Sequence, residues 1–176
     1  IDPEGWTNNT QPVLTFATSD ETSGISHYEL AINNGEFTRV TSPYQLEPQP
    51  DGEHIITVKA VDRAGWSTTS TVTAQIDTTP PEVVPNFRVV PGKTRMVLKW
   101  DKPSPDTVQY LLEKSGGNGV GVVEFVVDGE KVEYIDDGLP NGAAYQYRLR
   151  AVDRAGNIGL FTVWEEGITG LAYAPY

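Results

Sequence analysis

The sequence contains no cysteine and only two histidines among its 176 residues. Disulfide bridges, thiolate zinc sites and cysteine nucleophiles are therefore excluded. No apolar run reaches the roughly 18 residues that a membrane-spanning helix needs, and the opening IDPEGW lacks the basic and apolar regions of a signal peptide. Because an initiator methionine is also missing, we expect the chain to be an excerpt from a longer protein.

Positive charge is scarce as well. The chain has 13 lysines and arginines against 24 aspartates and glutamates, and its formal net charge is −11. The phosphates of nucleic acids and of anionic membranes would be repelled by such a chain, so we expect neither as a partner. The same charge is compatible with neutral ligands such as glycans, and with calcium.

The patterns of common enzyme sites are also missing: HExxH, GxSxG, a phosphate-binding loop and a dinucleotide fingerprint are all absent. His27 and His54 show no spacing that suggests a Ser–His–Asp triad. The paired carboxylates at 136–137 and 165–166 would point to opposite faces of a strand, whereas acid–base catalysis needs two groups that converge on one cleft. We therefore expect no catalytic residue, no cofactor-binding residue and no enzymatic activity.

The sequence does contain many short segments rich in β-branched and aromatic residues, separated by 13 prolines and 17 glycines. This pattern predicts an all-β fold without helices. The predicted strands include residues 13–17, 27–32, 54–60, 70–76, 95–100, 108–113, 122–127, 131–134, 144–152 and 160–164. Asn33-Asn34-Gly35 predicts a hairpin turn, because an Asn-Gly pair tolerates the positive φ angles that such turns require, and Asp128-Gly129 predicts another. About seven strands in each half indicate two immunoglobulin-like β-sandwiches in tandem.

Asp77-Thr78-Thr79-Pro80-Pro81 separates the two halves. Two prolines fix the backbone and cannot donate to a sheet, so the stretch predicts a stiff extended linker. We place the domains at residues 1–79 and 80–176.

The hexapeptide AVDRAG occurs twice, at 60–65 and at 151–156. Both copies fall at the end of the penultimate predicted strand of their half. The aspartate can accept hydrogen bonds from the N–H groups of a turn, and the glycine can take a left-handed conformation. The repeat therefore predicts the same tight turn in each sandwich.

The second half resembles a fibronectin type III domain. The matching residues include Trp100, YIDDGL at 134–139 and LPNGAAYQYRLRAVD at 139–153. The resemblance implies that Trp100 is buried and that Tyr145 forms the tyrosine corner, its hydroxyl bonding back to the preceding loop. Asn141-Gly142-Ala143 stands where the family usually has Pro-Gly-Thr.

The first half is similar to bacterial Ig-like repeats of exported and surface proteins. The matching stretches are GWTN at 5–8, SDETSGI at 19–25, GEHIITV at 52–58, DRAG at 62–65 and IDTTPP at 76–81. The resemblance implies a bacterial surface protein or a secreted carbohydrate-active enzyme, with the chain extracellular or at the cell surface. Its partners would be neighbouring modules of the same polypeptide, a polysaccharide or a surface protein.

Calcium binding is one chemical hypothesis, because calcium takes six to eight oxygen ligands from loops. Asp20, Asp62 and Asp77 could converge at the seam between the two modules. The alternative is that Asp20 and Asp62 cap their own turns and Asp77 caps the linker. No other cofactor is expected.

Aromatic side chains are the candidates for glycan contact, since sugar C–H faces pack on aromatic rings. Trp66 and Trp6 are the foremost candidates, followed by Tyr44, Trp164, Tyr173 and Tyr176. Trp66 follows the first AVDRAG, where a tight turn normally has a small polar residue. Packing on the linker and neighbouring domain, free exposure and ligand contact are all open for it.

The function that these features favour is that of a non-catalytic spacer or interaction module in a bacterial cell-surface or secreted multidomain protein. Two alternatives stay open: a carbohydrate-binding accessory module of a glycoside hydrolase, and an adhesin segment that binds a host protein.

Overall fold

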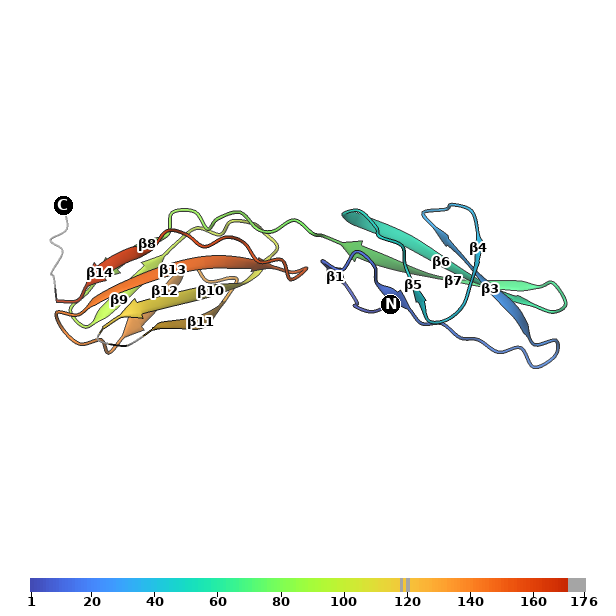
Figure 1. Ribbon diagram of the computed structural model, residues 1–176, viewed down its shortest axis with the longest axis horizontal. Coiled ribbons are helices and arrows are strands. Elements are labelled where there is room, and N and C mark those ends of the chain that lie inside the picture. Colours follow the sequence, from blue (N-terminus) through green and yellow to red (C-terminus); the bar gives the residue numbers. More distant parts are fainter. Residues whose placement is uncertain (118, 120, 171–176) are drawn as a thin grey trace. The chain divides into compact units, whose positions relative to one another are not determined.

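The computed structural model describes residues 1–117, 119 and 121–170 (Figure 1). The regular elements of these residues are β-strands, which confirms the all-β prediction. The chain divides into two compact units, Ile1–Thr79 and Pro80–Tyr176, each with its own hydrophobic core. Among the described residues, no helix is long and apolar enough to cross a membrane.

The first unit is a sandwich with two unequal layers. Its strands are β1 (Trp6–Thr7), β2 (Val13–Leu14), β3 (Ile25–Ile32), β4 (Thr38–Val40), β5 (Tyr44–Gln45), β6 (Gly52–Asp62) and β7 (Ser67–Ile76). One sheet has the order β1-β7-β6-β3-β4, and the other contains only β2 and β5. The second layer therefore covers only part of the larger sheet.

Strand β6 shows why these residues form a half-buried sheet. His54, Ile56 and Ala60 are buried, whereas Ile55 between them is 46% exposed. This alternation follows from the two-residue period of a strand. Ile56 belongs to a core made by Leu14, Leu30, Val40, Leu46, Ile56, Ala74 and Ile76.

The turn predicted at Asn33-Asn34-Gly35 forms between β3 and β4, but its positive φ angles do not fall on the Asn-Gly pair. Asn33 and Asn34 have φ angles of 51° and 60°, and the N–H of Gly35 donates to the carbonyl of Ile32 at 2.9 Å. The prediction assigned positive φ angles to the Asn-Gly pair. The closing hydrogen bond instead centres the turn on the two asparagines, which tolerate the left-handed region.

The second unit has seven strands in two more nearly equal layers. They are β8 (Arg88–Pro91), β9 (Arg95–Lys99), β10 (Thr107–Gly116), β11 (Val122–Asp128), β12 (Glu133–Asp137), β13 (Ala144–Asp153) and β14 (Glu165–Ile168). The sheets have the orders β11-β10-β13-β14 and β12-β9-β8. Trp100 is buried and packs edge-on against Tyr110, with ring centroids 5.3 Å apart, as the resemblance implied.

One hairpin prediction and one strand prediction in the second unit are wrong. Asp128-Gly129 does not join a hairpin, because β11 pairs with β10 whereas β12 pairs with β9 in the other sheet. A Cβ on Gly129 would lie 2.5 Å from the carbonyl carbon of Val108, so the glycine allows the chain to cross closely between layers. The last strand begins at Glu165, not at 160: Leu160 and Val163 are exposed.

The predicted tyrosine corner is also wrong in detail. Tyr145 is buried, but no hydrogen bond from its hydroxyl is present in the described part of the chain. The hydroxyl of Tyr147, on the same face of β13, donates to Asp136 Oδ2 at 2.6 Å instead. The pKa of Tyr147 is raised, mainly because the hydroxyl is buried and secondly because it donates to this carboxylate. Tyr145 contacts Lys114, whose Nζ lies 4.7 Å from the ring centroid.

The alternation in β6 gives a direct test of the fold. We expect Ile56→Ala to lower the free energy of unfolding of the first unit by about 2–5 kcal/mol, because it leaves a cavity in a closed core. The neighbouring Ile55→Ala should change it by only about 0.5 kcal/mol, because that side chain faces solvent. Urea denaturation followed through NMR signals of first-unit amides measures both. Equal effects of the two substitutions would contradict the assigned faces.

Candidate functional site

The first copy of AVDRAG forms the tight turn between β6 and β7. The N–H of Asp62 donates to the carbonyl of Trp66 at 3.0 Å, and the N–H of Trp66 donates to Asp62 Oδ1 at 2.8 Å. Gly65 has a φ of 92°, in the left-handed region. The carboxylate thus satisfies a donor at the bend, as the sequence predicted.

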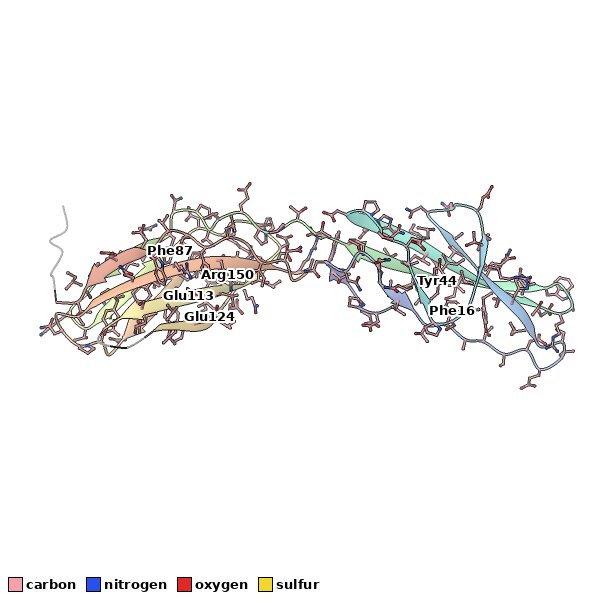
Figure 2. All side chains as sticks on the ribbon, in the orientation of Figure 1. Phe16, Tyr44, Phe87, Glu113, Glu124 and Arg150 are labelled. Atoms are coloured by element: carbon pink, nitrogen blue, oxygen red, sulfur yellow. The ribbon has the colours of Figure 1, made fainter. Side chains whose placement is uncertain are left out.

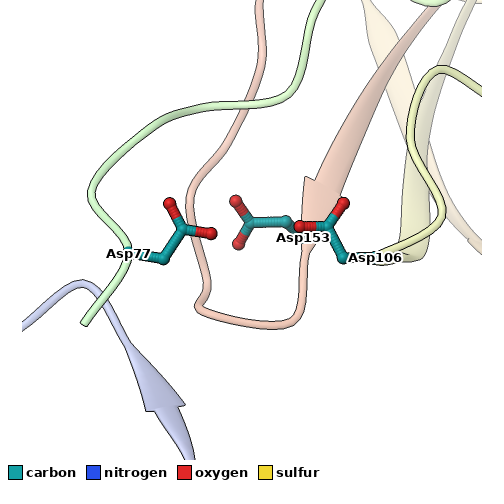
Figure 3. A group of neighbouring side chains, drawn as sticks. All are labelled: Asp77, Asp106 and Asp153. Atoms are coloured by element: carbon teal, nitrogen blue, oxygen red, sulfur yellow. The ribbon is translucent and has the colours of Figure 1, made fainter. Parts of the chain in front are cut away.

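The second copy forms the same turn after β13, where Figure 3 shows Asp153. Asp153 is only 3% exposed, and its carboxylate accepts from the N–H groups of Ala155 and Asn157, each at 2.9 Å. The N–H of Asp153 donates to the carbonyl of Asn157, and Gly156 has a φ of 87°. The prediction that the repeat encodes one turn in both sandwiches is therefore confirmed.

The residue that follows the glycine distinguishes the two turns. In the second, the side-chain amide of Asn157 donates to Asp153 Oδ2 at 2.9 Å and is buried with it. In the first, Trp66 is 78% exposed. An indole cannot fill the place of the amide, so it lies outside the turn. The same hexapeptide therefore produces a closed turn in one unit and an exposed aromatic side chain in the other.

A second aspartate lies beside the first turn. Asp20 Oδ1 accepts from the N–H groups of Ser23 at 2.6 Å and Gly24 at 3.0 Å. The hydroxyl of Ser23 lies 3.1 Å from Asp20 Oδ1 and 2.9 Å from Asp62 Oδ2, and so links the two carboxylates. The N–H of Ser23, and next that of Gly24, lowers the pKa of Asp20 below its ordinary value of 3.8.

Asp77 does not join this pair, which corrects the prediction that Asp20, Asp62 and Asp77 converge. The β6–β7 register pairs Val61 with Ser67 at one end and Gly52 with Ile76 at the other. The ten residues of β7, at about 3.3 Å per residue, place roughly 30 Å between the two ends. Calcium binding at Asp20 and Asp62 stays a prediction, for carboxylates that already accept hydrogen bonds from their own loops.

Trp66 lies at the same end of the hairpin as Asp62, far from the point at which the chain leaves the first unit. This position and its exposure contradict packing on the linker, one of the three interpretations of Trp66. A shallow groove of about 190 Å³ runs beside it. Its lining includes Thr18, Asp20, Ala60, Asp62, Trp66 and Thr68.

The other aromatic candidates lie apart from this groove. Trp6 is half-buried in β1, opposite Gln75 of β7. Tyr44 packs against the core of the first unit. Trp164 is covered by Arg148, whose guanidinium carbon lies 4.5 Å from its ring centroid. Tyr173 and Tyr176 lie outside the described residues. Trp66 and Trp6 therefore do not form a common binding platform.

Both histidines make hydrogen-bond contacts with neighbouring residues of the first unit. His54 is buried, and its ring nitrogens lie 2.8 Å from the carbonyl of Pro50 and 3.2 Å from the amide of Asn33. His27 lies 3.1 Å from both Ser26 and Glu29, in the order of a catalytic triad. Glu29, however, also binds Lys59 at 2.6 Å, and this pairing first of all lowers the pKa of Glu29. Glu29 is therefore shared between Lys59 and His27 in a structural cluster.

Asp51 is a residue whose role the sequence did not suggest. Its Oδ1 accepts from the N–H of Thr78 at 2.9 Å and from the Thr78 hydroxyl at 2.8 Å, and its Oδ2 accepts from the hydroxyl of Thr79 at 3.0 Å. These bonds, that of the Thr78 hydroxyl first, lower the pKa of Asp51. Asp77 Oδ1 accepts from the N–H of Thr79 at 3.0 Å, so Asp77 does cap the linker, the alternative to calcium binding.

Comparison with known proteins shows which folds the chain resembles. No protein-family model matches the chain. Exoglucanase B of Cellulomonas fimi is 33% identical, over 58% of this chain and 10% of that enzyme, so the chain spans about a tenth of this relative's length. The FN1–FN3 domains of chicken CNTN1 superpose with a TM-score of 0.55 at 17% identity, covering 94% of this chain and 61% of that structure.

Domains of titin superpose with a TM-score of 0.56 at 19% identity, over 84% of this chain and 56% of the titin structure. At such identities the likeness establishes the fold alone. The chain is all-β and folds into immunoglobulin-like β-sandwiches, as predicted, and its structural neighbours are fibronectin type III and immunoglobulin-like domains.

The lowered pKa of Asp20 predicts a pH-dependent contribution to stability. A depressed carboxyl pKa means that ionised Asp20 stabilises the folded state above the unfolded pKa, near 3.8, and that this contribution is lost as the pH falls through the folded pKa. The stability difference between the native chain and Asp20→Asn should therefore be largest above about pH 5 and shrink toward pH 2. Urea denaturation over this range measures it. Glu21→Gln is the matched control, and a difference that does not vary with pH would refute the assignment.

Proposed function

We propose that the chain is a non-catalytic spacer and interaction module of a bacterial multidomain protein that acts outside the cell. The observation that carries this proposal is that the connection between the two sandwiches is anchored on both sides. On the first side, Asp51 binds Thr78 and Thr79 through three hydrogen bonds. These bonds hold the first residues of the linker on the first unit.

On the second side, the chain packs into its sandwich shortly after the prolines. Val84 is 3% exposed and belongs to the core of the second unit. The carbonyl of Pro85 accepts from the N–H of Asp101 at 2.9 Å. A Cβ on Gly159 would lie 2.7 Å from the carbonyl oxygen of Pro81, so the backbone is in close contact there too. Only a short stretch of the linker lies between the anchors at Thr79 and Pro81, and the ring of Pro80 within it restricts the φ angle of that residue.

The remaining features are consistent with an accessory role. The polar groups around both histidines are engaged in structural contacts, and the groove carboxylates of Asp20 and Asp62 accept hydrogen bonds from the N–H groups of their own turns. The relative named an exoglucanase is ten times longer than the matched part, so a module of this kind would accompany a catalytic domain, not replace one. A net charge of −11 favours neutral partners, such as a glucan or a neighbouring module.

The anchor at Asp51 gives the test of the spacer function. In the native chain we expect the amides of Thr78 and Thr79 to be as rigid as those of β7, and the two units to tumble with similar rotational correlation times. Asp51→Ala should increase the motion of both threonines and separate the correlation times, because the linker loses three hydrogen bonds. Nitrogen-15 relaxation measures both quantities.

Glu53→Ala is the matched control, because Glu53 binds Gln75 on the adjacent strand and does not contact the linker. Independent tumbling of the two units in the native chain would overturn the spacer proposal. An unchanged linker in Asp51→Ala would show that the aspartate is not its anchor.

Carbohydrate binding is the second candidate function, and the observation that favours it is the exposure of Trp66 beside a groove with hydroxyl-bearing walls. Sugar rings pack on indole faces, and threonine and serine hydroxyls can bond to their hydroxyl groups. If this function is correct, cellohexaose or xylohexaose should bind in the millimolar range or tighter, and Trp66→Ala should weaken binding at least tenfold, about 1.4 kcal/mol.

Isothermal titration calorimetry and affinity electrophoresis measure this binding. Leu160→Ala removes a comparably exposed apolar side chain from the second unit and serves as the control. A native chain that binds neither oligosaccharide, or binding that Trp66→Ala does not weaken, would exclude this function for Trp66.

A further inference from the structure

A predicted strand in the first unit is only partly paired. The sequence predicts a strand over residues 13–17, but the ladder with β5 ends at Leu14. The strand alternation nevertheless continues: Phe16 is half-buried and packs edge-on against Tyr28 at 5.1 Å, whereas Thr15 and Ala17 are exposed. Phe16 and Tyr44 are labelled in Figure 2. The side chains thus behave as those of a strand beyond the point where its pairing stops.

The backbone groups of this segment point alternately to two sides. The N–H of Phe16 donates to the hydroxyl of Ser42 at 2.9 Å, and that of Thr18 lies 3.1 Å from the hydroxyl of Tyr28. On the opposite side, Val13 exchanges two backbone hydrogen bonds with Asp2, of 2.9 and 3.0 Å. This pair is the start of an antiparallel ladder.

The ladder does not continue along the free edge. By the alternation of an antiparallel pair, the next residues to face the Asp2 side are Thr15 and Ala17. Neither residue has a backbone hydrogen-bond partner among the residues that the structure describes. Unpaired strand edges of this kind are templates for another strand.

A groove of about 330 Å³ lies along this edge. Its lining includes Ile1, Leu14, Phe16, Tyr28, Thr69 and Val72. The far wall is β7, of which only Gln75 and Ile76 pair with β1. The N–H of Asp77 donates to Thr7 on that outer side, so the backbone groups of Thr69, Thr71 and Thr73, in the same alternation, also face outward. Two unpaired strand edges therefore border an apolar groove.

We propose that this groove holds one extended polypeptide strand, which continues the Asp2–Val13 ladder antiparallel to residues 15–17. The strand comes from the same protein, on the amino side of Ile1. Ile1 already packs against the core of the first unit, and Asp2 fixes both the direction and the register of the backbone. A glycan in the groove would leave the edge N–H and C=O groups without their regular partners.

The register specifies the chemistry of this strand. Asp2 lies opposite Val13, so Ile1 lies opposite Leu14 and the residue directly before Ile1 pairs with Thr15. The second residue before Ile1 then lies opposite Phe16 and points into the core, because directly opposed residues share a face. It must be apolar. The residues on either side of it face solvent and are free to be polar.

Hydrogen exchange of the chain in two lengths tests the proposal: the 176 residues alone, and the same chain preceded by the eight residues that its gene encodes directly before Ile1. We expect exchange at Thr15 and Ala17 to slow at least tenfold in the longer chain. Changing the second residue before Ile1 to aspartate should abolish this protection. Changing the first residue to aspartate, on the solvent face, should leave it intact.

Four results would overturn the proposal. The first is unchanged exchange at Thr15 and Ala17 in the longer chain, and the second is protection of Thr69 and Thr71 in their place. The third is that the gene encodes fewer than three residues ahead of Ile1. The last is that cellohexaose protects Thr15 and Ala17 of the 176-residue chain equally well. The third would exclude a strand from the same polypeptide. The last would assign the groove to a glycan.

Discussion

In each unit, the hydrogen bonds that turn N–H groups donate to one aspartate determine much of the structure. Asp62 and Asp153 each accept from the residue four positions later and so fix where the penultimate strand reverses. A slip of one residue would move every side chain to the other face of the sheet. With the bend set at Asp62, Ile56 points into the core, Trp66 lies outside the turn and Asp77 lies at the opposite end of β7. The separation of the predicted calcium ligands is a direct consequence.

The two sandwiches use this common turn in different structural settings. In the second unit both layers are well formed, and the side chains of Asp153 and Asn157 are buried inside the turn. In the first unit one layer has only two short strands, which leaves an apolar groove between residues 14–18 and β7. A strand in this groove would complete the smaller layer. The first unit thus carries both the exposed indole of Trp66 and this apolar groove.

The proposed spacer function rests on a polar anchor, not on the prolines alone. Prolines restrict the backbone at 80 and 81, but they form no hydrogen bond through nitrogen. Asp51 supplies the missing attachment by accepting from Thr78 and Thr79, and Val84 enters the second core only a few residues later. The attachment of the linker to the first unit thus depends on a loop residue about thirty positions away in sequence.

The sequence by itself determined the features that depend on local pattern. Alternating side chains predicted strands, the proline pair predicted the break between the halves, and the repeated hexapeptide predicted its turn, because each depends on residues close together in the chain. The tertiary structure alone decided which strands pair. In the folded chain β11 and β12 lie in different sheets, and the last strand begins at Glu165. The hydroxyl of Tyr147, not that of Tyr145, forms a hydrogen bond with Asp136, and Asp77 lies far from Asp62. Asp51 was missed for the same reason: its partners become neighbours only when β6 and β7 lie side by side, and no local pattern encodes that pairing.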